Sequence, residues 1–94
     1  METQKIKTAV VLLNWNGKRW LEKFLPTLLE YSNDATVFVA DNYSTDDSVN
    51  FIKNNFSSVK VIINSDNGGY AKGYNDALRQ INAKYFVLLN TDIE

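Results

Sequence analysis

The stretch Thr36–Ser48 reads TVFVADNYSTDDS, and it decides the fold that we expect. Its apolar part, Val37–Ala40, is too short for a helix and is typical of a strand buried on both faces. Asp41 and Asn42 end this run at the position where open α/β sheets place their ligand contacts. The hydroxyl and acidic side chains of Ser44–Asp47 then indicate a helix start. The alternative is a well-capped strand-to-helix turn that binds no ligand.

Composition limits the classes of protein to consider. The 94 residues suffice for one small domain, and the 45% of apolar residues favours a folded core over disorder. A net charge of −1 argues against a nucleic-acid binder. The absence of Cys and His excludes disulfide and thiolate chemistry and removes the commonest general base. Residues 1–7 lack a signal-peptide apolar region, and no run approaches the roughly 20 residues of a membrane span, so we expect a cytoplasmic protein.

Strands and helices are expected to alternate along the whole chain. The predicted strands are short apolar runs, namely Thr8–Leu13, Thr36–Ala40, Val59–Ile63 and Tyr85–Leu89. The predicted helices carry apolar residues at spacings of three and four, and they cover Lys18–Tyr31, Ser44–Asn55 and Tyr70–Asn82. This order predicts an α/β fold, a parallel four-stranded sheet between two helical layers.

Polar residues follow every predicted strand. These clusters are Asn14-Trp15-Asn16, Asp41-Asn42, Asn64 to Asn67, and Asn90-Thr91-Asp92. Parallel strands bring their carboxyl ends to one edge of the sheet, so the four clusters should converge there. Helix capping alone does not require so many polar groups on one rim. The sequence therefore predicts a ligand-binding edge.

Three of these features suggest particular chemistry. In an extended segment Asn90, Asp92 and Glu94 point to one side, and their oxygens suit Mg²⁺ or Mn²⁺, although a polar strand end is the alternative. The glycines of Asn67–Gly73 would allow a phosphate to approach a helix start, or would simply form a tight turn. Trp15 would cover a nucleobase, or would pack against the protein.

Four ordered motifs carry a family resemblance. They are LLNWNGKRWLEKFLPTLL (12–29), VFVADNYSTDDSVNFIK (37–53), INSDNGGYAKGYNDAL (63–78) and YFVLLNTDIE (85–94). Together they resemble the N-terminal, nucleotide-sugar-binding half of family 2 glycosyltransferases of the GT-A fold, and most of all the rhamnosyltransferase-like members. The resemblance covers residues 6–94 and implies a Rossmann-like half with strand order 3-2-1-4.

The resemblance also implies site residues from all four motifs. The implied nucleotide-binding residues are Leu13, Trp15, Asp41, Asn42, Gly69, Lys72, Gly73, Asn75 and Asn90. Among them, Leu13 and Trp15 would line the base pocket, and Asp41 and Asn42 would hydrogen-bond the base. Asp92 would bind the metal, a divalent cation such as Mg²⁺ or Mn²⁺. We expect Asp41 to matter more for binding than for folding, because it need not satisfy a buried partner.

Two features depart from the family pattern. Asn90 stands where the family usually has the first Asp of its Asp-x-Asp motif. The chain ends at Glu94, whereas the family carries its acceptor site and catalytic base, usually an Asp, in a C-terminal half. We therefore assign no catalytic residue and expect a truncated, inactive domain. Tyr85–Leu89 would then form an apolar edge strand with only Lys84 nearby as a guard, which predicts a two-fold homodimer.

The function that the resemblance implies is transfer of a sugar from a nucleoside diphosphate to an acceptor hydroxyl. The expected partners are the nucleotide sugar and an unknown glycan or lipid acceptor, as in polysaccharide biosynthesis, and no nucleic acid. In the complete enzyme the chain would be cytoplasmic, or peripheral at the inner face of the membrane. One alternative is a non-catalytic nucleotide-binding or assembly module. Another is a receiver-like domain with Asp41 as phospho-acceptor, but Asn14, Trp15 and Asn16 supply no acidic pair for it.

Overall fold

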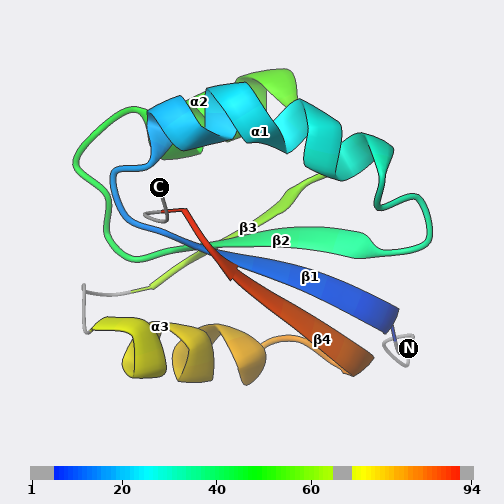
Figure 1. The fold of residues 1–94 in the computed structure, drawn as a ribbon. Coiled ribbons are helices and arrows are strands. Elements are labelled where there is room, and N and C mark those ends of the chain that lie inside the picture. The colour runs from blue at the N-terminus through cyan, green and yellow to red at the C-terminus, as the bar shows by residue number, and fades with distance from the viewer. Residues whose placement is uncertain (1–5, 65–68, 92–94) are drawn as a thin grey trace.

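The computed structural model describes residues 6–64 and 69–91 of the chain. Strands and helices alternate in the predicted order within these residues (Figure 1). The elements are β1 (Ile6–Asn14), α1 (Lys18–Glu30), β2 (Thr36–Asp41), α2 (Ser48–Asn55), β3 (Lys60–Ile63), α3 (Gly69–Leu78) and β4 (Ala83–Asn90). None of the helices in these ranges is long and apolar enough to cross a membrane.

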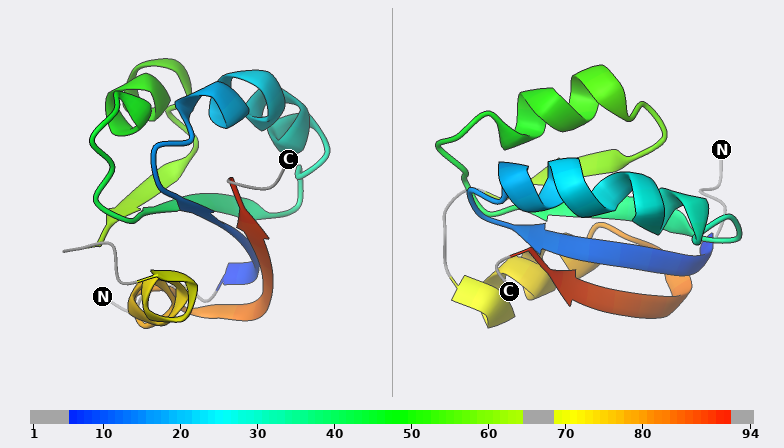
Figure 2. Two further views of the ribbon diagram at one scale, coloured as in Figure 1. Left: turned by 60° about the vertical axis from the view of Figure 1, so that its left-hand side comes forward. Right: turned by 45° about the horizontal axis from the view of Figure 1, so that its top comes forward.

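The four strands form one sheet in the order β3-β2-β1-β4. All three strand pairs are parallel, and in their register Leu12 of β1 lies beside Val39 of β2 and Leu89 of β4. Figure 1 and Figure 2 show α1 and α2 together over one face of the sheet and α3 on the opposite face. The predicted three-layer α/β fold and its strand order are therefore confirmed.

The central strand β1 supplies side chains to two apolar layers. On one face the core is formed with α1 and α2 by Val10, Leu12, Leu21, Leu25, Val37, Val39, Ile52 and Val59. On the other face it is formed with α3 by Ala9, Val11, Leu13, Phe38, Ala40, Ala77 and Ile81. Alternating side chains of a strand point to opposite faces, so a strand covered on both faces must be continuously apolar. This requirement explains the uninterrupted apolar runs of β1 and β2.

Two predicted helix boundaries are wrong. The helix expected from Ser44 begins at Ser48, because the Ser44 hydroxyl bonds to the Asp41 side chain instead of capping a helix. The residue before the helix is Asp47, and the carboxylate of Asp46 accepts from the Ser48 amide at 3.0 Å. The helix expected to reach Asn82 ends at Leu78, since the Asn82 carbonyl accepts from Ile6 at the start of β1.

The two edges of the sheet differ in length and in exposure. In the described residues β3 pairs only with β2 and β4 pairs only with β1. The β3 edge is four residues long and begins with Lys60, whereas β4 has eight residues. Four successive large side chains of β4 are exposed, namely Tyr85 (54%), Phe86 (39%), Val87 (45%) and Leu88 (46%). The sequence prediction of an apolar edge strand is confirmed.

Candidate functional site

The topology defines where a ligand would be expected to bind. In the sheet, β2 and β3 lie on one side of β1, and the chain reaches them through α1 and α2. The chain then passes through α3, on the opposite face, to β4, which lies on the other side of β1. Such a reversal of strand order opens a crevice beyond the carboxyl ends of the two diverging strands. We call this rim, formed by the residues that follow β1, β2, β3 and β4, the carboxyl edge.

Asn14 lies at the centre of the carboxyl edge and is fully buried. Its Nδ2 donates to Asp41 Oδ1 at 2.9 Å, which ties the end of β1 to the end of β2. Its Oδ1 accepts from Thr91 Oγ1 at 2.9 Å and from the Gly17 amide at 3.1 Å. One amide side chain therefore joins β2, the residue after β4 and the turn that leads into α1.

Asp41 is buried and fully engaged in the fold. Besides the bond from Asn14, its carboxylate accepts from the Ser44 amide at 2.9 Å and from the Ser44 hydroxyl at 2.7 Å. The expectation that Asp41 need not satisfy a buried partner is therefore wrong. Removing a buried carboxylate would leave its donors unpaired, so substitution of Asp41 would lower stability as well as any binding.

Asn16 fixes the loop that links β2 to α2. It has a positive φ of 53°, which Asn tolerates better than most residues. Its side-chain Oδ1 accepts from the backbone amides of Thr45 and Asp46 at 2.7 and 3.0 Å. Its backbone amide donates to Ser44 Oγ at 2.9 Å. The turns after β1 and β2 thus form one hydrogen-bonded unit.

Gly17 is required by close packing at the same place. A Cβ there would lie 2.4 Å from Asn14 Oδ1 and 2.4 Å from Thr91 Oγ1. Real Cβ atoms do not approach oxygen atoms so closely, so any side chain at Gly17 would displace the Asn14–Thr91 pair. The glycine therefore allows α1 to begin directly against the ends of β1 and β4.

The other face of the carboxyl edge is closed by α3. Asn64 Nδ2 donates to Asn42 Oδ1 at 2.8 Å and to the Gly73 carbonyl at 3.3 Å. A Cβ on Gly73 would lie 2.7 Å from Leu13 Cδ1 and 2.9 Å from the Asn42 amide atoms. The structure thus brings together Leu13, Asn42 and Gly73, three of the predicted nucleotide-binding residues. All three are buried, and they hold α3 against the sheet.

The remaining predicted residues lie on or near the surface of this edge. Trp15 directly follows β1 and exposes 51% of its side chain. Lys72 and Asn75 are exposed on α3, where Lys72 Nζ pairs with Asp76 at 2.9 Å. Asn90 is half-buried at the end of β4, and Gly69 is the first residue of α3. Roles in ligand binding stay predictions for all of them.

The predicted metal ligand, Asp92, lies outside the described residues. Within residues 6–64 and 69–91 no three acidic, His or Cys side chains gather into a group that could hold a metal ion. Asn90, the other residue of the predicted metal motif, would contribute only a neutral amide oxygen. A hard cation would therefore depend on Asp92 and on oxygens of a bound phosphate.

The sequence did not reveal that four residues stabilise the carboxyl edge through hydrogen bonds or close packing. These residues are Gly17, Ser44, Asn64 and Thr91. Ser44 was interpreted as a helix cap, and Asn64 and Thr91 were counted only as members of polar clusters. Several of their partners are distant along the chain: Asn42 lies 22 positions from Asn64, and Asn14 lies 30 positions from Ser44 and 77 from Thr91. A pattern of local spacing cannot reveal such contacts. The only available signal was the polar character of every strand end.

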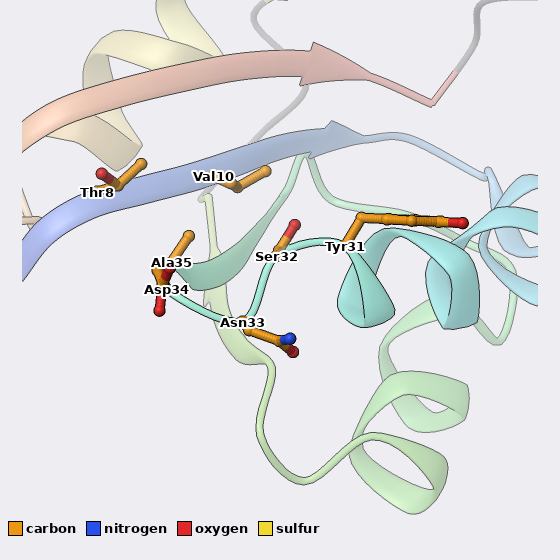
Figure 3. Close-up of a pocket in the computed structure, with 7 residues that line it drawn as sticks. All are labelled: Thr8, Val10, Tyr31, Ser32, Asn33, Asp34 and Ala35. Atoms are coloured by element: carbon orange, nitrogen blue, oxygen red, sulfur yellow. The ribbon is translucent and has the colours of Figure 1, made fainter.

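A separate pocket of about 370 Å³ lies away from this edge. It is lined by Thr8 and Val10 of β1 and by residues 31–35, which connect α1 to the start of β2 (Figure 3). Asp34 is the only charged residue of this lining. The pocket is therefore at the amino ends of the strands, where parallel sheets do not usually bind ligands.

The fold and the polar carboxyl edge define an α/β protein of the class that binds ligands beyond the ends of parallel strands. Residues 9–94 match the pattern described as glycosyl transferase family 2, so the chain belongs to that family. A search of curated protein sequences gave no match.

Several solved structures share the fold, and two of them are compared with this chain. Residues 1–349 of S. aureus TarS, in complex with UDP-GlcNAc, superimpose with a TM-score of 0.78 at 24% identity, over 92% of this chain and 26% of that one. The mannosyltransferase PcManGT from Pyrobaculum calidifontis, in complex with GDP-Man and Mn²⁺, superimposes with a TM-score of 0.77 at 22% identity. The match covers 96% of this chain and 28% of that one. The chain thus spans about a quarter of the length of each structure.

The central role of Asn14 gives the first prediction. Asn14→Ala should lower the free energy of unfolding by about 2–4 kcal/mol, because it leaves buried groups of Asp41 and Thr91 without partners. The control is Asn50→Ala, since Asn50 makes an exposed side-chain bond to Asp47. That change should stay within about 0.5 kcal/mol. Urea unfolding followed by circular dichroism measures both values, and equal losses for the two variants would refute the role of Asn14.

Proposed function

We propose that the chain binds the nucleoside diphosphate of a sugar donor at its carboxyl edge, as the donor-binding part of a glycosyltransferase. The observation that carries the proposal is the convergence of four polar strand ends on one rim in a chain of glycosyl transferase family 2. The neighbours with bound UDP-GlcNAc and GDP-Man support it.

In the proposed arrangement the base lies over the ends of β1 and β2. Trp15 directly follows β1 and offers an exposed flat ring, and the buried Asp41 and Asn42 lie at the end of β2. Ribose and diphosphate would extend toward the start of α3 and the end of β4. Exposed Lys72 and Asn75 and half-buried Asn90 lie on that side, together with the backbone of Gly69.

A divalent cation would be held by Asp92 and the donor diphosphate. The Mn²⁺ in the mannosyltransferase structure supports a cation of this kind. When bound, such a cation would neutralise charge on the departing diphosphate. The contribution of the described residues is to position the donor, since Asn90 offers only an amide at the corresponding place.

Transfer of the sugar would require a base that the described carboxyl edge does not offer. Asp41 is buried and bonded to Asn14 and Ser44, Asp46 accepts from the Ser48 amide, and Asp47 lies 3.9 Å from Lys18 Nζ. We propose that the base and the site for a glycan or lipid acceptor come from outside these residues. We further propose that the protein is of the rhamnosyltransferase-like subtype. It would act in polysaccharide biosynthesis, at the inner face of the membrane.

Because these carboxylates are already bonded within the fold, they equally favour a second candidate function. This candidate is a nucleotide-binding module without catalysis. The two candidates share the donor site and differ only in the transfer step. Sugar release from UDP-GlcNAc or GDP-mannose, followed with a set of hydroxyl acceptors, distinguishes them. For the 94-residue chain we expect binding without transfer under either candidate, and only a longer protein that contains it would transfer sugar under the first.

Donor binding gives the second prediction. Trp15→Ala should weaken binding of UDP or GDP by about 5–150-fold, since base–aromatic stacking contributes about 1–3 kcal/mol. The matched control is Tyr31→Ala, because Tyr31 is exposed and lines the pocket at the opposite edge. Its affinity should equal that of the unmodified protein. Calorimetric titration measures the dissociation constants of all three proteins.

Two outcomes of this titration would contradict the proposal. Absence of binding for both nucleotides in the unmodified protein would reject a donor site on this chain. A loss of affinity in Tyr31→Ala but not in Trp15→Ala would transfer the site to the pocket of Figure 3.

We also propose that the open β4 edge pairs with a second copy of the chain. Unpaired N–H and C=O groups on a long apolar edge favour pairing with another strand. An apolar groove lined by Trp20, Phe24, Thr27, Leu28, Tyr31 and Leu89 lies beside β4, between it and α1, and extends the apolar surface. A two-fold axis perpendicular to the sheet would make the two β4 strands antiparallel.

Self-association gives the third prediction. Light scattering should show a mass that rises toward twice that of the monomer with concentration, and Leu88→Lys should restore the monomer by placing a charge on the edge. Ile63→Lys is the control, because Ile63 is 57% exposed on the opposite edge strand, β3. A monomer at every concentration, or equal effects of both substitutions, would exclude the β4 interface.

A further inference from the structure

Tyr43 has an unusual backbone conformation at the carboxyl edge. Its φ is 63°, in the left-handed region that glycine adopts without cost and that bulky residues seldom occupy. Its side chain is 61% exposed, so its ring gains little from packing in the folded chain. A glycine or asparagine would satisfy the same backbone at lower cost. The fold alone therefore does not explain an aromatic residue here.

The surrounding hydrogen bonds impose this conformation. On one side of Tyr43 the Asn42 amide donates to the Asn14 carbonyl at 2.7 Å. On the other side the Ser44 amide and hydroxyl both donate to the carboxylate of Asp41, at 2.9 and 2.7 Å. Residues 42 and 44 are thus fixed to the ends of β1 and β2, and Tyr43 has to bridge them. The ring is presented from a rigid support.

The turn that carries Tyr43 lies beside the turn that carries Trp15. The Asn42 amide is bonded to Asn14, and the Asn16 amide is bonded to Ser44 Oγ at 2.9 Å. Residues 14–16 and 42–44 therefore run side by side, and Trp15 and Tyr43 are their middle residues. Both side chains are more than half exposed, and neither ring stacks on another aromatic ring in the described part of the chain.

We propose that Tyr43 is a second aromatic contact for the nucleobase, in addition to Trp15. This inference rests on the proposed function, because it requires the base to lie over the ends of β1 and β2. Two exposed rings on adjacent rigid turns, beside the buried Asp41, form a surface suited to a flat heterocycle. Strained residues persist where the surrounding structure holds them, and they cluster at ligand contacts.

The test combines thermal stability with nucleotide affinity in three variants. Tyr43→Asn removes both the ring and the strain, Tyr43→Phe keeps both, and Tyr31→Asn removes an exposed ring from the opposite edge. We expect Tyr43→Asn to raise Tm by about 4–8 °C and to weaken UDP or GDP binding by about fivefold or more. Tyr43→Phe should match the unmodified protein in both measurements. Tyr31→Asn should leave affinity unchanged.

The outcomes separate this inference from the proposed function. If Trp15→Ala weakens binding and Tyr43→Asn does not, Tyr43 makes no contact with the base and the inference is wrong while the donor site stands. If the unmodified protein binds neither nucleotide, both fail. A Tm of Tyr43→Asn that does not rise would show that the left-handed conformation costs nothing, which would remove the reason for assigning Tyr43 a role.

Discussion

The buried side chain of Asn14 is the interaction on which the carboxyl edge depends. It contacts Asp41 at the end of β2, Thr91 after β4 and Gly17 before α1. Asp41 and Thr91 need partners because they are withdrawn from water, and an amide is suitable because it both donates and accepts. The same bonds that join the strand ends also fix the turns that carry Trp15 and Tyr43. Stability and ligand presentation therefore share one network.

The fold was largely predictable because its causes are local or periodic. Continuous apolar runs identified strands that are buried on both faces, and spacings of three and four identified the helices between them. Strand order is not encoded in these periods and followed from the family resemblance. The start of α2 was mispredicted because Ser44 has two possible partners, and its bond to Asp41 depends on the tertiary structure.

The position of the candidate site was predictable, but the sequence did not show which of its residues stabilise the fold and which are exposed to a ligand. Polar residues after every strand correctly indicated the rim, yet Asp41 and Asn42 are buried and serve the fold. Gly73 was interpreted as room for a phosphate, whereas its lack of a side chain is required by contact with Leu13 and Asn42. Trp15 and Tyr43 are exposed and do not pack in the core. This difference in burial cannot be inferred from residue type alone.

The central claim is that a nucleotide binds at the carboxyl edge, over a support fixed by Asn14. Backbone amide shifts of the ¹⁵N-labelled protein, recorded during titration with UDP or GDP, test it most directly. We expect concentration-dependent shifts at residues 13–16, 41–45, 69–75 and 90–92, with residues 31–35 unchanged. Shifts confined to residues 8–10 and 31–35, around the pocket at the opposite edge, would contradict it.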